Sequence, residues 1–346
     1  MSDSVTASRP AGNRPICLLV LPLGFYGFGQ VLRKELERRS MDVVMENDEF
    51  PRNNFGRILG KLGFLRLLRW QTLRVFKQNH GTGGTVYDLV LIVKGRGVGR
   101  DLVAFLRTIS KRVVGYNFDS FSFNPSPLDW LQEVDRYTTF DPMDSAEQGL
   151  PLVHLFSAFP ATEVPPEKRY DVSAIMKNHS QRLVYTDRVL SALNGRSRFI
   201  YIFESNVFSF IQGLARHPGL YLKYWENIHF KPLPYAGFIQ ALSGSRCTVD
   251  FAHPLQTGLT IRCFEARSAG VAIVTNNHHV LGHPSFQAGG ALHFPLNGDP
   301  ARLACEMEPL FSLNLPREAR TVAEFMSELL GEVPAIGEST ASFRHN

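Results

Sequence analysis

Short apolar runs alternate with amphipathic stretches along most of this chain. Runs with few polar residues predict strands that are buried on both faces, as in a parallel sheet. The predicted strands cover residues 16–21, 42–46, 87–94, 112–116, 170–175, 198–203, 247–250, 271–274 and 291–294. Predicted helices cover residues 101–110, 182–193, 207–216, 234–243, 300–311 and 322–330.

Strands and helices alternate in two series, and this order predicts an α/β fold of two doubly wound, Rossmann-like domains facing a cleft. A proline-rich segment at residues 159–168 is interpreted as the linker between them. We expect an N-terminal domain over residues 15–158, a C-terminal domain over residues 169–312, and a final helix and tail over residues 313–346.

The chain has 346 residues, and 44% of them are hydrophobic, which is enough for a substantial core in each of two domains. Its net charge of +5 suits an anionic nucleotide, lipid or nucleic acid. Four scattered cysteines without a CxxC pair predict neither a disulfide framework nor a metal site, so a reducing, cytoplasmic location fits best. No apolar run approaches the roughly 20 residues of a membrane-spanning helix, and residues 16–21 are interpreted as a strand rather than a signal peptide.

Residues 246–277 form the most informative stretch: a strand ending in an acid, a loop, a helix and a second strand. Ligands of open parallel sheets bind at the carboxyl ends of such strands. We expect the helix to open at Gly258, Leu259 and Thr260, because their backbone N–H groups would then form a positive end suited to a diphosphate. Thr257 adds a hydroxyl donor, as does Thr260.

Charged side chains in the same stretch fit a phosphorylated ligand. His253 and Arg262 would supply positive charge, and Glu265 lies too deep in the helix to cap its start. Its carboxylate would instead accept hydrogen bonds from a ribose diol. Gly270 is expected to end the helix. An ordinary βαβ unit with a capped helix is the alternative interpretation.

The sequence HPxQTGLTxRxxExxxAG, followed by VTNN, resembles the nucleotide-sugar motif of CgeB-like, family-1-type bacterial glycosyltransferases. These proteins have the GT-B fold and belong to surface-polysaccharide gene clusters. The resemblance covers roughly residues 87–294 and is strongest in the second half. It implies that the loop and helix start hold the donor diphosphate, and that Glu265 holds the ribose. The donor-binding residues would be Gln256, Thr257, Gly258, Leu259, Thr260, Arg262, Glu265 and Asn276.

Two departures from the family pattern limit what the resemblance implies. The Lys that relatives tend to carry after the helix glycine is absent, and with it one phosphate contact. Gln256 and Thr257 occupy the region where many retaining enzymes have a second carboxylate, about two turns before Glu265. The sequence therefore does not decide between retention and inversion at the sugar.

Two residues are candidates for catalysis. Asp119 follows a predicted strand at its carboxyl end, where a base that activates an acceptor hydroxyl could project; alternatively it caps the next helix or turn. His253 would help to stabilise the leaving diphosphate. Asp141, followed by Pro142, is interpreted as a helix cap. No DxD pair or ligand cluster lies near the loop, so we expect no metal, and no cofactor other than the nucleotide-sugar substrate.

Further cations follow the first strand of the second series. Lys177 and Arg182 are candidate phosphate contacts, with His179 between them, although surface charge explains them as well. In the first series a glycine-rich turn at residues 24–29 follows the first strand, where backbone can approach a ligand closely or serve packing alone.

Residues 51–87 contain no acid, while basic, leucine and aromatic residues are interleaved. A basic amphipathic helix of this kind can lie on an anionic membrane surface, which would make the protein peripheral at the inner face of the membrane. The alternative is a domain-covering helix with a solvated basic side. No known base-reading module is present, so nucleic acid is not an expected partner.

The leading hypothesis is a cytoplasmic glycosyltransferase that moves a sugar from a nucleotide-diphosphate sugar to a surface glycan, such as lipopolysaccharide, capsule or exopolysaccharide. A non-catalytic nucleotide-sugar or glycan-binding protein and a sugar-nucleotide epimerase are the alternatives. The sequence does not specify the donor base and sugar, the acceptor, the linkage or the oligomeric state.

Overall fold

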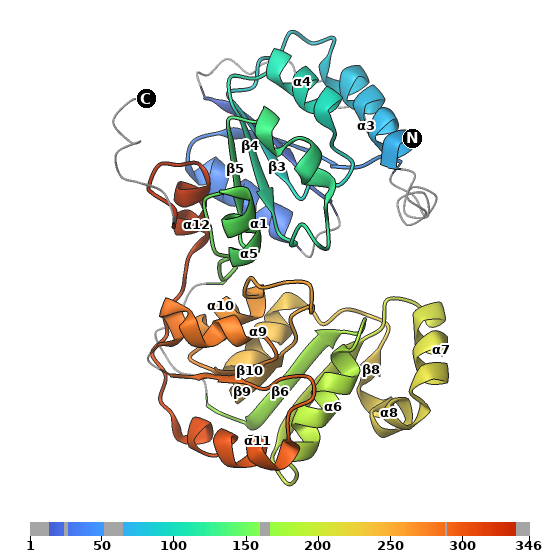
Figure 1. Ribbon diagram of the computed structural model, residues 1–346, viewed down its shortest axis with the longest axis vertical. Helices are drawn as coiled ribbons and strands as arrows, with labels where there is room; N and C mark the ends of the chain where they lie inside the picture. Colours follow the sequence, from blue (N-terminus) through green and yellow to red (C-terminus); the bar gives the residue numbers. More distant parts are fainter. Residues whose placement is uncertain (1–13, 24–26, 52–64, 160–166, 288, 337–346) are drawn as a thin grey trace. The chain divides into compact units, whose positions relative to one another are not determined.

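The computed structural model describes residues 14–23, 27–51, 65–159, 167–287 and 289–336. It divides into two compact units. Unit 1 comprises Met1–His154 and Val322–Asn346, and unit 2 comprises Leu155–Thr321 (Figure 1). The chain therefore leaves unit 1 near His154 and returns to it for its last helix.

Unit 1 contains a sheet of five parallel strands in the order β2-β1-β3-β4-β5. The strands are β1 Ile16–Val20, β2 Asp42–Glu46, β3 Leu89–Val93, β4 Val113–Asn117 and β5 Arg136–Thr139. The helices are α1 Phe28–Arg38, α3 Leu65–His80, α4 Arg100–Thr108, α5 Pro142–Gln148 and α12 Val322–Leu329, with 3₁₀ turns at Ser126–Asp129 and Leu131–Glu133. Every residue of β3 and β4 is buried, as their apolar sequences predict.

Helix α12 packs into unit 1 although more than 170 residues of chain separate it from α5. Phe325 is fully buried, and its ring centroid lies 5.0 Å from that of Tyr116 at the end of β4. Arg136 donates to the carbonyl oxygens of Leu329 (3.0 Å) and Glu328 (3.0 Å), the last acceptors of the helix. A cation at this end also complements the helix dipole.

Unit 2 contains six parallel strands in the order β11-β10-β9-β6-β7-β8. The strands are β6 Tyr170–Lys177, β7 Arg198–Phe203, β8 Ile228–His229, β9 Ser245–Asp250, β10 Ala272–Thr275 and β11 Ala291–His293. The helices are α6 Arg182–Ala192, α7 Val207–Arg216, α8 Pro218–Lys223, α9 Tyr235–Ser243, α10 Ile261–Ser268 and α11 Pro300–Met307. Short 3₁₀ turns occupy Trp225–Asn227, His278–Gly282, Pro284–Phe286 and Pro309–Ser312.

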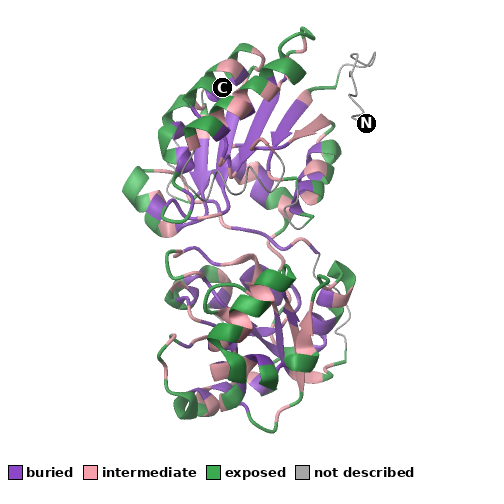
Figure 2. Ribbon diagram, turned by 90° about the vertical axis from the view of Figure 1, so that its right-hand side faces the viewer, coloured by how far each residue is buried: buried purple, intermediate pink, exposed green. Residues whose placement is uncertain are grey.

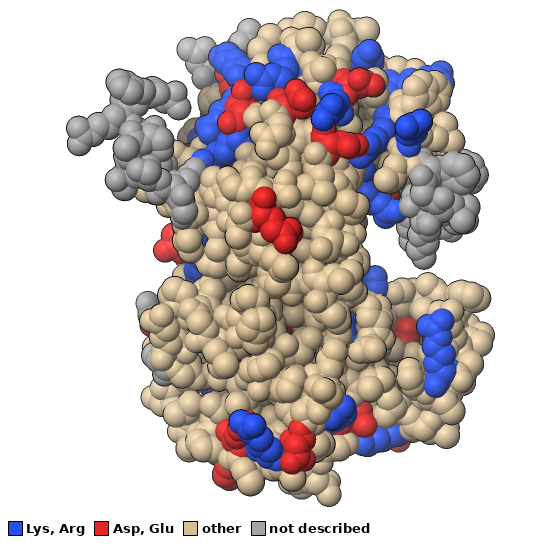
Figure 3. Space-filling model, viewed as in Figure 1, with Lys and Arg blue, Asp and Glu red and all other residues tan. Residues whose placement is uncertain are grey.

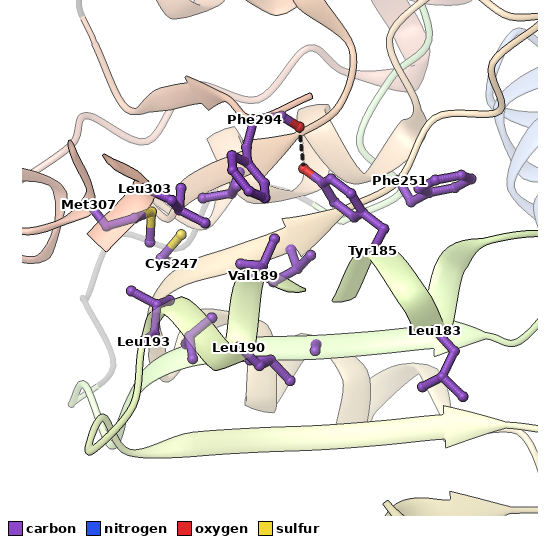
Figure 4. Packing of buried hydrophobic residues seen from close by; sticks show 14 of the residues in the cluster. Leu183, Tyr185, Val189, Leu190, Leu193, Cys247, Phe251, Phe294, Leu303 and Met307 are labelled. Carbon is purple, nitrogen blue, oxygen red and sulfur yellow. Dashed lines mark hydrogen bonds between the residues drawn. The ribbon is translucent and has the colours of Figure 1, made fainter. Parts of the chain in front are cut away.

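Each unit has its own apolar core between sheet and helices, and Figure 2 shows buried strands flanked by helices with exposed outer faces. In unit 2 the core joins α6 to β9 and to the segment after β10 (Figure 4). Tyr185 is buried there, and its hydroxyl donates to the Phe294 carbonyl oxygen at 3.1 Å. This bond satisfies a polar group that would otherwise be costly inside an apolar core.

Most predicted elements are present, and two predicted helix ends are confirmed. Gly270 follows α10 with φ +60°, the left-handed conformation that favours glycine after a helix. Asp141 caps α5 by accepting from the N–H groups of Met143 (3.0 Å) and Asp144 (3.3 Å), with Pro142 as first residue. Among the described residues no helix combines the length and the apolar character needed to cross a bilayer.

Candidate functional site

In unit 2 the direction in which the chain adds strands reverses between β6 and β9. Strands β7 and β8 extend the sheet on one side of β6, and β9, β10 and β11 extend it on the other (Figure 1). Open parallel sheets bind ligands in the crevice at such a switch point, beyond the carboxyl ends of the strands. The loops that follow β6 and β9 therefore frame the expected site.

These two loops bring four basic side chains together. Burial, together with the nearby Arg182, Lys177 and His253 side chains, lowers the pKa of His179 to about 4. Lys177, Arg182 and His253 were predicted from separate parts of the sequence, and all three lie close enough to His179 to affect its titration. A local excess of positive charge at this edge favours an anionic ligand.

The loop after β9 differs from the prediction in where the helix begins. Helix α10 begins at Ile261 rather than at Gly258, and Thr260 precedes it in an extended conformation. The Thr260 hydroxyl donates to Asp250 at 2.7 Å, and the Asn277 side-chain amide donates to the carbonyl oxygens of Thr257 (3.0 Å) and Gly258 (3.1 Å). These bonds hold residues 257–260 outside the helix.

The positive end of α10 is therefore formed by the backbone N–H groups of its first turn, starting at Ile261, and not by those of Gly258, Leu259 and Thr260. Cys263 N–H already donates to the Thr260 carbonyl oxygen at 3.0 Å. Leu259 is buried at 3% exposure, so it anchors the loop in the core. The prediction that this region is a helix N-terminus stands, displaced by three residues.

Asn276 follows β10, and its side chain forms two hydrogen bonds with the loop after β9. Its side-chain oxygen accepts from Ala252 N–H (2.8 Å), and its nitrogen donates to the Ala252 carbonyl oxygen (2.9 Å). The Gln256 N–H donates to the His253 carbonyl oxygen at 2.9 Å, which turns the chain at the loop's tip. Asn276, predicted as a donor contact, thus shapes the loop that presents His253.

Glu265 is the most unusual carboxylate of this region. It is 3% exposed, and burial raises its pKa to about 7 although the Arg262 charge acts in the opposite direction. Its hydrogen-bond partner is the Tyr235 hydroxyl at a long 3.4 Å, and Arg262 Nε lies 3.9 Å from the second oxygen. A buried carboxylate with such weak donors is suited to accept hydrogen bonds from a ligand.

Arg262 is held against Glu265 by packing. Its guanidinium lies 4.2 Å from the centre of the Phe238 ring, and Nη2 donates to the Ile175 carbonyl oxygen at 3.2 Å. The buried Nη1 has no hydrogen-bond partner among the described residues. Arg262, at the start of α10, therefore connects this helix to β6. Its Nη1 remains available to donate a hydrogen bond.

Unit 1 carries a second group of charges at the carboxyl ends of its strands. Asp119, the predicted base, pairs with Lys94 (Oδ2 to Nζ, 2.8 Å), and its side chain caps none of the helices in the described part of the chain. Lys94 follows β3 with φ +69°, a conformation that costs energy for a non-glycine residue and is concentrated at functional sites. Lys94 was not among the predicted site residues; its position directly after an apolar strand was the available signal.

Asp48 was also missed by the sequence analysis. It follows β2, is 1% exposed, and accepts the Arg96 N–H at 3.2 Å. Burial and the Glu49 charge raise its pKa to about 7, against the opposing charge of Lys94. Its second oxygen has no hydrogen-bond partner among the described residues, so unit 1 holds a buried carboxylate near the Lys94–Asp119 pair.

No cluster of three metal-ligating side chains occurs within the described parts of the chain. Part of the predicted glycine-rich turn, residues 24–26, and part of the predicted basic segment, residues 52–64, lie outside the described residues. The two candidate catalytic residues belong to different units, Asp119 to unit 1 and His253 to unit 2.

Comparison with solved structures settles the architecture. Sucrose-phosphate synthase from Thermosynechococcus elongatus matches with TM-score 0.55 and 10% identity, covering 92% of this chain and 94% of that one. HepE from Anabaena, solved with UDP and glucose, matches with TM-score 0.54 and 11% identity, covering 92% and 100%. The chain has the GT-B fold.

A third GT-B match is UDP-GlcNAc 2-epimerase from Methanocaldococcus jannaschii, solved with UDP-GlcNAc and UDP, with TM-score 0.53 and 11% identity over 92% of this chain and 99% of that one. No protein-family model matches the sequence, and neither does any curated protein. At such low identity the likeness establishes the fold alone, and function must be argued from the site.

Proposed function

We propose that this GT-B protein is a glycosyltransferase that moves a sugar from a nucleotide-diphosphate sugar to a surface-glycan acceptor. The observation that carries the proposal is the convergence, at the switch point of unit 2, of basic side chains from two loops with the start of α10 and the buried carboxylate of Glu265. A nucleotide diphosphate needs both kinds of contact: cations and N–H donors for its phosphates, and an acceptor for its ribose hydroxyls.

In this proposal the diphosphate lies between the loops after β6 and β9. Lys177, Arg182 and His253 supply charge, and the first turn of α10 supplies N–H groups. Glu265, on the same helix, accepts from the ribose diol, while Arg262 keeps its Nη1 for the nucleotide. Asn276 and Thr260 act through the loop they shape.

The reaction breaks the bond between the sugar's anomeric carbon and the diphosphate, and forms a bond from that carbon to the acceptor oxygen. Charge that develops on the departing diphosphate is stabilised by the basic side chains of unit 2. The acceptor hydroxyl loses its proton, for which Asp119 is the proposed base, with Lys94 orienting its carboxylate. The acceptor is proposed to be a glycan or lipid-linked glycan, met in the cytoplasm or at the inner face of the membrane.

A second candidate is a sugar-nucleotide epimerase, because the fold also matches an epimerase that was solved with UDP-GlcNAc and UDP. An epimerase acts on the nucleotide sugar with no acceptor present. NMR of the nucleotide sugar with the protein alone separates the candidates, since the epimerase produces a second sugar configuration and the transferase does not.

Both candidate functions require a nucleotide-sugar site in unit 2. A thermal-shift screen against nucleotide diphosphates and their sugars tests for this site. We expect one nucleotide to stabilise the protein by about 2.7 kcal/mol at 100 times its dissociation constant. The variant Lys177→Met/Arg182→Met should lose this shift, and Arg216→Gln, an exposed cation on α7, should keep it. If no nucleotide shifts the melting temperature, or if both variants respond alike, the donor site is not at this edge.

A further inference from the structure

Unit 1 contains a pocket between α3 and α4 that the proposed transfer reaction does not use. It has a volume of about 480 Å³. From α3 it is lined by Arg66, Arg69, Trp70 and Leu73, and from the start of α4 by Gly99, Arg100, Asp101 and Leu102, with Asp129 completing the wall. Figure 3 shows Lys and Arg side chains gathered over this part of unit 1, with acidic side chains among them.

Of the three arginines that line the pocket, Arg69 forms part of its wall, whereas Arg66 and Arg100 place positive charge at its surface. Arg69 pairs with Asp129 and donates to the Ser126 hydroxyl at 3.0 Å, so it is part of the wall. Arg66 is exposed and has no ion pair with any described residue. Arg100 is 71% exposed; its Nε donates to the Asp129 carbonyl oxygen at 2.6 Å and lies 3.9 Å from Glu133. Guanidinium groups grouped in this way suit a phosphate.

Beside the pocket, α3 exposes large apolar side chains. Trp70 is 56% and Leu67 47% exposed, while Leu68 and Phe76 on the opposite side are buried in the core. Arg74 lies over the Trp70 ring, 5.8 Å from its centre. Helix α3 contains no acidic residue, so its outer side joins apolar and aromatic groups to arginines, as in helices that lie at a membrane surface.

We propose that this pocket binds the phosphate headgroup of an anionic membrane lipid, with Trp70 and Leu67 inserted at the level of the headgroups. Arg66 and Arg100 contact the phosphate oxygens, and Asp101 limits the affinity. The exposed Trp70 and Leu67 favour a lipid in a bilayer as the ligand. A small dissolved anion such as phosphate would leave both side chains in water. The inference goes beyond the proposed sugar transfer and does not depend on it.

Vesicle co-sedimentation of the full chain tests the proposal, with phosphatidylglycerol vesicles compared with phosphatidylcholine vesicles. Arg66→Gln/Arg100→Gln should lower the affinity for phosphatidylglycerol about thirtyfold, given two lost contacts to the anionic surface. Lys34→Gln/Arg38→Gln removes the same charge from exposed positions of α1, away from the pocket, and should lower the affinity less than threefold. Asp101→Asn should raise the affinity. Melting temperatures confirm that each variant is folded.

Two further arms separate a lipid from a soluble anion. Trp70→Ser should weaken vesicle binding at least tenfold, and inorganic phosphate alone should not raise the melting temperature of the unchanged protein. The proposal is overturned if the protein does not bind phosphatidylglycerol, or if the two arginine-containing double variants lose affinity equally. It is also overturned if phosphate stabilises the protein while Trp70→Ser binds vesicles normally, since the pocket would then hold a dissolved anion.

Discussion

Glu265 is a buried carboxyl whose protonation should change if it binds the proposed nucleotide. Its pKa in the folded protein is raised to about 7 by burial, above the ordinary 4.5. A carboxyl with a raised pKa binds its proton more tightly in the folded state than in the unfolded one. The free energy of unfolding of the apoprotein therefore falls as pH rises from about 4.5 to about 7. A nucleotide whose ribose hydroxyls donate hydrogen bonds to the ionised Glu265 carboxylate would instead favour loss of this proton.

We predict that affinity for a nucleotide sugar increases roughly tenfold between pH 6 and pH 8, as Glu265 ionises. Glu265→Gln should remove this increase and weaken binding at pH 8 by about 1.5–3 kcal/mol, because a charge-assisted bond is lost. Titration calorimetry with a nucleotide sugar measures both effects, since its doubly esterified diphosphate does not titrate in this range. Protonation of a histidine at low pH would strengthen binding of the anionic nucleotide at pH 6. An affinity that rises with pH therefore identifies Glu265 as the titrating group.

The pair of Lys94 and Asp119 allows a second prediction. Asp119→Asn should lower turnover by about 10²–10⁴ while the affinity for the donor stays nearly unchanged, because the base acts on the acceptor. Turnover per folded molecule and donor affinity are measured separately. Should the variant lose thermal stability and keep its turnover, the ion pair is structural and the base lies elsewhere.

Among the secondary-structure elements, the predicted strands and most predicted helix starts agree with the structure to within two residues, and the start of α10 is the exception. The apolar runs that became β3, β4 and β10 were predicted to within two residues of their observed ends, and every residue of these strands is buried, as expected of continuous hydrophobic sequence in a parallel sheet. The start of α10 was placed three residues early. Its true position depends on Asp250 and Asn277, which lie 10 and 17 residues from Thr260 in the sequence and meet the loop only in the folded unit.

Two edge strands, β5 and β8, were not predicted. β5 reads RYTT and β8 has two residues, and neither carries an apolar run. Each is a strand because its neighbour, β4 or β7, offers backbone hydrogen bonds. The candidate site followed the same rule: its loop could be identified from local sequence, whereas Lys94 and Asp48 became candidates only once tertiary contacts showed their charges close together.

At the scale of the whole molecule, the two units have separate apolar cores, so we predict that they unfold in separate transitions. Phe325 is fully buried in unit 1, so Phe325→Ala should reduce the stability of that unit by about 3–5 kcal/mol. Calorimetry should show the transition of unit 1 shifted to lower temperature, with the transition of unit 2 in place. Ala323→Ser, on the exposed side of the same helix, is the matched control. A single transition that shifts as a whole would show that the units unfold together.

The return of the chain to unit 1 also sets an order for folding during synthesis. Every strand of both sheets has been made before α12 leaves the ribosome, and unit 2 is complete at Thr321. The first unit to be started is thus the last to be finished, because Tyr116 and Arg136 await partners from the final helix. A chain truncated after Thr321 should therefore carry a folded unit 2 beside an incomplete unit 1.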